Sequence, residues 1–177
     1  RGTASLFGDG AAATILGQVP ELYGFAPFSL ASDGELADVV SIPGGGSRHP
    51  DGDHTIHMDG RTVRGFIVDH LPEIISDTLK RHRITMGDVD HFVTHQPNPL
   101  LLRQVAEKVG IPSDRLVVVG EDVGNIGAAC IPYALAQCAG EGRFTNGDLI
   151  LIAGFGAGFT WGSTLLTWHS SRAVRMH

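Results

Sequence analysis

The fold of this chain is constrained most strongly by an alternation, from residue 63 onward, of segments with helical spacing and short apolar runs. Two segments carry apolar residues every three or four positions and a third is rich in alanine, which predicts helices over residues 63–82, 99–110 and 126–139. Short apolar runs predict strands at residues 90–94, 116–119, 149–153 and 159–168. This order predicts an α/β fold with a mostly parallel, buried sheet.

The segment before residue 63 has a different character. Residues 6–16 are apolar and small around Gly8-Asp9-Gly10, which predicts a turn followed by a buried strand centred on residues 12–15. Shorter strands are predicted at residues 30–32 and 39–40. Residues 42–57 are rich in Gly, Pro and His and predict a long loop. Because long loops in compact domains often carry function, we expect this loop to form the rim of a pocket.

Composition excludes several classes of function. A net charge of −6 and the lack of a Lys/Arg cluster argue against a nucleic-acid binder. The longest apolar runs are too short to span a bilayer, so we expect no membrane segment and a cytoplasmic location. Cys130 and Cys138 lie in one predicted helix, too far apart to bridge each other, and are expected to be reduced and buried. We predict no metal site.

Three groups of residues follow predicted strands and are therefore expected at one edge of the sheet. They are His95, Asn125 and the glycine-rich run 154–158. Each has a structural alternative, because His95 could be a structural histidine, Asn125 a helix cap and the glycine run a hairpin turn. Together, an imidazole, a carboxamide and glycine-lined backbone N–H groups predict an uncharged pocket that stabilises an oxyanion.

The same three groups carry a family resemblance, together with Phe7-Gly8-Asp9-Gly10-Ala11 near the start. In order, they read His95-Gln96-Pro97-Asn98, then residues 124–129, then residues 154–163. From about residue 5 to 168 the chain resembles the C-terminal portion of the beta-ketoacyl-acyl carrier protein synthase III family, which are thiolase-like condensing enzymes. The resemblance implies the C-terminal half of a layered αβαβα architecture. Residues 1–58 would end the N-terminal half and form the connecting loop, and residues 59–177 would form the C-terminal half.

The resemblance also implies a reaction. Members of this family transfer an acyl group from acyl-CoA to a cysteine and condense it with malonyl-acyl carrier protein by decarboxylative Claisen chemistry, in fatty acid or polyketide priming. Coenzyme A thioesters are substrates, and no cofactor is expected. By likeness, His95 and Asn125 are catalytic and the Ala157 N–H belongs to an oxyanion hole. The implied substrate-binding residues are Phe155, Gly156, Asn98, Met58 and Gly60.

The nucleophilic cysteine of the family has no counterpart here, because neither Cys130 nor Cys138 stands at its position, and Cys130 occupies a place where relatives usually carry Ser. We therefore expect the cysteine on an N-terminal half that is cleaved, separately encoded or not represented. Obligate association with that half and a homodimer are expected.

Two departures from the family pattern concern the carrier protein. Pro97 stands where Ala is usual, and Leu100 stands where Arg is frequent, so an acidic carrier protein loses one contact unless Arg103 replaces it. This leaves open a coenzyme A thioester as acceptor. Two further alternatives are an acyltransferase that acylates a small molecule without decarboxylation, and a non-catalytic half that acts as a scaffold for an active subunit.

Overall fold

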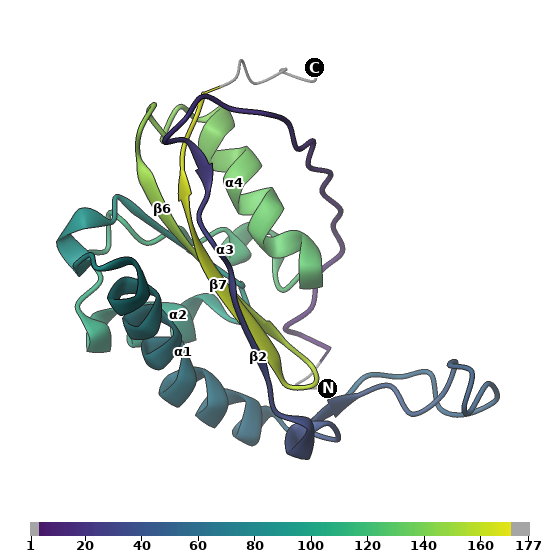
Figure 1. Cartoon of the computed structure of the whole chain (residues 1–177). Helices are drawn as coiled ribbons and strands as arrows, with labels where there is room; N and C mark the ends of the chain where they lie inside the picture. Colours follow the sequence, from purple (N-terminus) through teal and green to yellow (C-terminus); the bar gives the residue numbers. More distant parts are fainter. Residues whose placement is uncertain (1–3, 171–177) are drawn as a thin grey trace.

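The computed structural model describes residues 4–170 of the chain. A twisted sheet lies between helix α4 on one face and helices α1 and α2 on the other (Figure 1). The elements of the sheet layer are β1 (Gly24–Phe25), β2 (Ser29–Ser32), β5 (His91–Thr94), β6 (Leu149–Gly156) and β7 (Thr160–Thr167). A small separate ladder pairs β3 (Val40–Ser41) with β4 (His57–Met58). The helices are α1 (Gly60–His82), α2 (Pro99–Val109), α3 (Gly120–Val123) and α4 (Cys130–Gly140), with 3-10 turns at Gly34–Leu36, Met86–Asp88 and Gly127–Ala129.

The sheet is mixed, so the prediction of a mostly parallel sheet is wrong. Its order is β1-β7-β6-β5, with β2 also paired to β7. Strands β5 and β6 are parallel, whereas β7 is antiparallel to β6, β1 and β2. The physical reason is the short connection between β6 and β7, because a hairpin can join only antiparallel strands and a parallel pair needs a longer crossover.

Most predicted elements are present. The predicted helices at 63–82 and 99–110 are confirmed as α1 and α2, and α2 ends at Gly110 in the left-handed conformation (φ 80°). The third helix begins with the 3-10 turn at Gly127–Ala129 before α4. Three of the four later predicted strands are confirmed as β5, β6 and β7. The fourth is reduced to one parallel bridge between Leu116 and Phe92.

The buried strand predicted at residues 12–15 does not form. Residues 8–20 lie outside any helix or strand, and the side chain of Ile15 is 99% exposed. Within residues 4–170, no neighbouring strand offers hydrogen bonds to residues 10–19. An apolar segment forms a β-strand only where a neighbouring strand supplies backbone hydrogen bonds. This explains why the segment is the extended coil drawn in purple in Figure 1.

The hydrophobic core is divided by the sheet into two clusters. On β5, Phe92 packs toward α1 and α2 while its neighbour Val93 packs toward α4, and both are fully buried. On β6, Leu151 and Ile150 repeat this alternation. Successive side chains of a strand point to opposite faces, so strands covered on both sides are apolar at every position. This packing fixes β5 and β6 firmly, and the residues that follow them are fixed with them.

Helix α1 is held at both ends. The Asp59 carboxylate accepts hydrogen bonds from the Thr62 hydroxyl and from the backbone N–H groups of Thr62 and Arg61. The bond from the Thr62 hydroxyl, followed by those from the two N–H groups, lowers the pKa of Asp59. Near its other end, the buried Thr78 hydroxyl donates to the Ser163 hydroxyl of β7 at 2.6 Å. The helix runs through Pro72 without a break. The first turn of α1 is therefore held in one position beside the end of the sheet.

Candidate functional site

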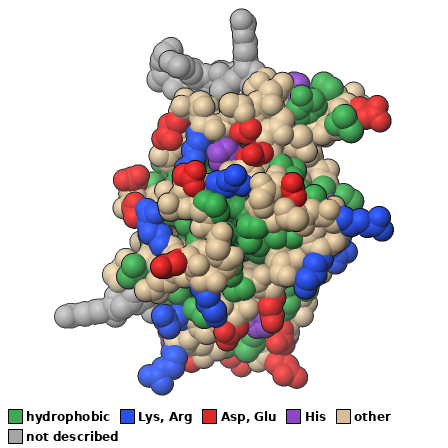
Figure 2. Space-filling view, turned by 90° about the vertical axis from the view of Figure 1, so that its left-hand side faces the viewer, with side chains coloured by type: hydrophobic (Ala, Val, Ile, Leu, Met, Phe, Trp, Pro, Cys, Tyr) green, Lys and Arg blue, Asp and Glu red, His purple; other side chains and the backbone are tan. Residues whose placement is uncertain are grey.

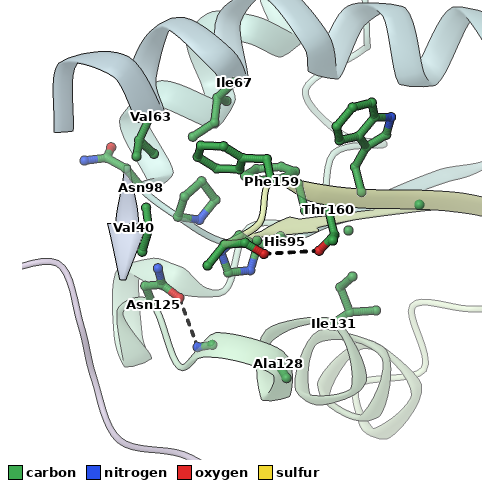
Figure 3. A pocket seen from close by; sticks show the side chains of 18 of the residues that line it. Val40, Val63, Ile67, His95, Asn98, Asn125, Ala128, Ile131, Phe159 and Thr160 are labelled. Carbon is green, nitrogen blue, oxygen red and sulfur yellow. Dashed lines mark hydrogen bonds between the residues drawn. The ribbon is translucent and has the colours of Figure 1, made fainter. Parts of the chain in front are cut away.

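A pocket of about 1110 Å³ opens where β5 ends, between the first turn of α1 and the start of α4 (Figure 3). The eight site residues suggested by the family resemblance all line it. They are His95, Asn125, Ala157, Phe155, Gly156, Asn98, Met58 and Gly60. The pocket lining also includes Val40. The loop at residues 42–57, which we expected to form the rim, contributes no lining residue, so that prediction is wrong. The structure thus brings together residues that are far apart in the sequence.

His95 enters the pocket from the end of β5. Its backbone N–H donates to the Ala153 carbonyl of β6 at 2.9 Å, which continues the parallel ladder by one residue. Its ring meets the ring of Phe155 edge to face at 5.1 Å. Among the described residues, the ring nitrogens have no hydrogen-bond partner, so they are available to a ligand. Burial disfavours the charged imidazolium and lowers the pKa of His95 to about 4, so the ring is neutral at pH 7.

Gln96, the next residue, fixes the loop that carries His95. Its buried side-chain amide donates to the carbonyls of Thr94 and Val117 at 3.0 and 3.1 Å. Its oxygen accepts from the backbone N–H groups of Val119 and Gly120 at 3.0 and 3.3 Å. All four hydrogen-bonding positions of this amide are therefore used. The amide joins the end of β5 to the segment that leads to Asn125.

Asn125 is held by the N-terminal motif. Its backbone N–H donates to the Leu6 carbonyl at 2.8 Å, and its carbonyl accepts from the Gly8 N–H at 3.0 Å. A Cβ atom on Gly8 would overlap the Val123 carbonyl, so only glycine allows this close approach. The Asn125 side-chain oxygen accepts from the Gly127 N–H at 2.9 Å. In Figure 3, the amide nitrogen is drawn on the side of the group away from that bond, and both Asn125 and His95 line the pocket.

The glycine run is a hairpin turn, and it also lines the pocket. Phe155 and Gly156 end β6, and the turn continues through Ala157. The Thr160 hydroxyl donates to the Ala157 carbonyl at 3.3 Å, as drawn in Figure 3. Beyond the turn, the buried ring of Phe159 stacks on Phe66 of α1 at 4.4 Å. These contacts hold the turn in one conformation, which leaves the Ala157 backbone beside the pocket.

The remaining predicted residues lie around the mouth. Asn98 caps α2, because its side-chain oxygen accepts from the Leu101 N–H at 3.0 Å, which leaves its amide nitrogen free to donate to a ligand. Met58 and Gly60 flank the start of α1. Sequence reasoning missed the apolar wall that α1 contributes through Val63 and Ile67. The helical spacing of these two residues predicts that they are buried. That they face the pocket follows from the position of α1 beside the sheet, which the sequence does not show.

Charge near the pocket is sparse and mixed. Arg64 is the charged side chain among the described lining residues. Arg103, considered above as a carrier-protein contact, instead pairs with Glu121 at 3.0 Å, and Leu100 is 67% exposed. On the side where α1 and α2 lie, acidic and basic side chains are interspersed around apolar ones (Figure 2). This face does not present a field of one sign to an acidic partner.

Two further properties concern residues 4–170 as a whole. These residues contain no cluster of three or more His, Cys, Asp or Glu side chains that could hold a metal ion. No helix among them is long and apolar enough to cross a membrane.

Comparisons with known proteins agree with one another. Residues 79–168 match the family model described as 3-oxoacyl-[acyl-carrier-protein (ACP)] synthase III C terminal. A beta-ketoacyl-[acyl-carrier-protein] synthase III from Desulfitobacterium hafniense (strain Y51) is 40% identical, with 98% of this chain and 54% of the relative covered. Acetoacetyl CoA synthase NphT7 from Streptomyces sp. (strain CL190) is 37% identical, with 95% of this chain and 54% of the relative covered.

The solved structures point the same way. A beta-ketoacyl-[acyl carrier protein] synthase III from Thermus thermophilus superposes with a TM-score of 0.88 at 36% identity, covering 97% of this chain and 54% of that one. The likeness confirms the predicted α/β, thiolase-like fold class. The chain spans about half the length of the curated relatives it matches.

Replacing Gln96 by Leu tests the buried amide. We expect Gln96→Leu to lower the free energy of unfolding by about 2–5 kcal/mol, because the Val119 and Gly120 N–H groups lose their acceptor in a buried place. Urea unfolding of the protein that contains this chain measures the loss. Gln104→Leu, at an exposed position of α2, is the control and should change little. Equal losses in the two variants would contradict the account.

The low pKa of His95 predicts a dependence of stability on pH. Between about pH 6.5 and 4, the unfolded chain binds a proton on this histidine and the folded chain does not, so stability falls as pH falls through that window. The slope due to His95 is at most about 1.4 kcal/mol per pH unit. We expect His95→Gln to remove this part of the acid destabilisation in denaturant unfolding measured at several pH values. Identical pH profiles for the two proteins would show that His95 titrates normally.

Proposed function

Because the chain belongs to the 3-oxoacyl-[acyl-carrier-protein] synthase III family, we propose that it supplies the decarboxylating part of a condensing site. The proposed reaction is the decarboxylative Claisen condensation of an acyl-CoA starter with malonyl-acyl carrier protein, in fatty acid or polyketide priming. One observation carries the proposal: the neutral imidazole of His95 and the carboxamide of Asn125 line one pocket, beside a glycine hairpin. Coenzyme A thioesters are substrates in this proposal, and no cofactor takes part.

The proposed chemistry begins at the carbonyl of the malonyl thioester. The imidazole of His95 and the amide nitrogen of Asn125 donate hydrogen bonds to this oxygen. The bond between the α-carbon and the carboxylate breaks, and carbon dioxide leaves. The electron pair of this bond stays with the α-carbon to form the enolate, whose negative charge moves onto the same oxygen. Fixed donors in a pocket shielded from water stabilise that charge more than water does. The enolate carbon then attacks the acyl thioester, a carbon–carbon bond forms, and the cysteine thiolate leaves.

The other residues have supporting roles in this proposal. The Ala157 N–H donates to the oxyanion that forms when the acyl thioester is attacked, together with an N–H beside the nucleophile. Phe155 forms an apolar wall where the carboxylate departs, and Gly156 allows close approach of the thioester. Met58, Gly60 and Asn98 line the passage for the pantetheine arm.

The acyl-carrying cysteine is proposed to come from an N-terminal part of the protein. Cys130 and Cys138 are both buried, and burial raises the pKa of the Cys138 thiol, so neither suits a nucleophile. We propose that residues 1–58 end the N-terminal thiolase-like half, that residues 59–177 form the C-terminal half, and that the whole enzyme is a homodimer. Residues 1–3 and 171–177 of these units lie outside the described part.

Exposed apolar side chains support such an association. Nine of the large hydrophobic residues with high exposure fall between residues 15 and 56, and they are Ile15, Leu16, Val19, Leu22, Phe25, Phe28, Leu30, Ile42 and Ile56. An apolar surface of this extent is unfavourable in water and favours a covering partner.

One observation favours a second substrate in place of malonyl-acyl carrier protein. Arg103 is neutralised by Glu121, and the exposed Leu100 adds no charge, so the rim offers little to an acidic carrier protein. The acetoacetyl CoA synthase among the relatives is named for a coenzyme A product. The alternative proposal is therefore condensation with malonyl bound to coenzyme A, by the same site and the same residues.

The role of His95 is tested by separating the two half-reactions. In the enzyme that contains this chain and its acyl-carrying cysteine, we expect His95→Ala to slow malonyl-thioester decarboxylation by at least about 100-fold, because an oxyanion donor is lost. Transfer of the starter acyl group to the cysteine, followed by mass spectrometry, should stay near the wild-type rate.

His54→Ala, in the exposed loop, is the matched control and should affect neither step. A fall of acylation and decarboxylation together, or no change in either, would contradict the proposed role of His95.

A further inference from the structure

The proposed chemistry leaves one buried group next to the site unused, the thiol of Cys130. This cysteine is the first residue of α4 and is 1% exposed. Its sulfur lies 3.7 Å from the side-chain oxygen of Asn125, within the range of a hydrogen bond to sulfur. Cys130 is not among the residues that line the pocket, so its sulfur is not presented to a thioester there. A role as nucleophile is therefore excluded by burial, and a role through Asn125 remains.

The Asn125 side-chain oxygen has two donors directed at it. The Gly127 N–H donates at 2.9 Å and the Cys130 thiol at 3.7 Å. A carboxamide oxygen has two lone pairs and a thiol has one hydrogen to donate, so the two bonds match the acceptor. If the amide turned over, its NH₂ group would face the Gly127 N–H, which is a donor opposite a donor. The two bonds therefore favour a single orientation.

We propose that Cys130 is a positioning residue, whose thiol acts with the Gly127 N–H to hold the Asn125 amide with its nitrogen toward the pocket. That nitrogen is the donor end of the amide, and Figure 3 draws it on the side away from the bond to the Gly127 N–H. The inference rests on the proposed function of Asn125 in stabilising the enolate. It adds that the orientation of this catalytic amide depends on a side chain in α4 that never touches the substrate.

The size of the effect follows from the type of bond. A hydrogen bond of this kind contributes modestly, so its loss is expected to slow the step that uses Asn125 by about threefold to tenfold. The effect should be confined to decarboxylation, because acyl transfer to the cysteine does not involve the Asn125 amide. A merely structural role of Cys130 would lower stability and both half-reactions alike.

A spectroscopic measurement tests the bond without any reference to activity. A hydrogen-bonded thiol has a lower S–H stretching frequency than a free thiol. Raman spectra of the whole enzyme, wild type minus Cys130→Ser, isolate the band of this thiol, and Cys138→Ser identifies the other cysteine of the chain. We expect the S–H band of Cys130 below the frequency of a free thiol. In Asn125→Ala, this band should shift to higher frequency. A band at the free-thiol frequency that does not move in Asn125→Ala would overturn the proposal.

A kinetic comparison tests the consequence. Cys130→Ala removes the donor, and we expect the decarboxylation kcat to fall about threefold to tenfold, with acylation of the nucleophile unaffected. Cys130→Ser restores a donor and should recover most of the lost rate. Cys138→Ala, a buried cysteine in the same helix but away from the pocket, should change neither step.

The outcomes separate this inference from the proposed function. Equal loss in Cys130→Ala and Cys130→Ser, or equal loss of both half-reactions in Cys130→Ala, would overturn the positioning role. A wild-type enzyme that does not decarboxylate a malonyl thioester would overturn the proposed function instead. In that case the thiol band alone decides whether Cys130 holds the amide of Asn125.

Discussion

The site depends above all on the parallel pairing of β5 with β6. Thr94 stands opposite Ala153 in this ladder, and the His95 N–H continues it to the Ala153 carbonyl. Because parallel strands end at the same edge of a sheet, His95 comes to lie beside Phe155 and the hairpin, although a long stretch of chain separates them. Both strands are buried on two sides, which leaves their ends little freedom to move.

Asn125 reaches the same place by a different means, because it follows no complete strand. Its backbone forms hydrogen bonds with Leu6 and Gly8. The segment before it forms hydrogen bonds with the side chain of Gln96, in the loop that follows β5. Its side chain is then oriented by Gly127 and, as we propose, by Cys130. The Asn125 amide is thus oriented before any substrate arrives, which in the proposed reaction is the condition for stabilising a developing oxyanion.

Much of this could be predicted from the sequence, and the failures have physical causes. Helices α1 and α2 follow from local periodicity. The residues around the pocket follow from a family resemblance that short motifs carry, and their proposed roles stay predictions. The strand at residues 12–15 failed because a strand exists only where a neighbour is present to pair with it. The bonds of Gln96 and Cys130 could not be predicted, because they depend on where distant backbone groups come together in three dimensions.

The central claim is that this pocket decarboxylates a malonyl thioester and directs the carbanion to an acyl group. The most direct test is the mass of the product formed from an acyl-CoA starter and malonyl thioester labelled with ¹³C at all three malonyl carbons. The account predicts a product that carries the starter acyl group and two labelled carbons, with the third released as carbon dioxide. Transfer of the starter to an acceptor that contains no malonyl carbon, without labelled carbon dioxide, would contradict it.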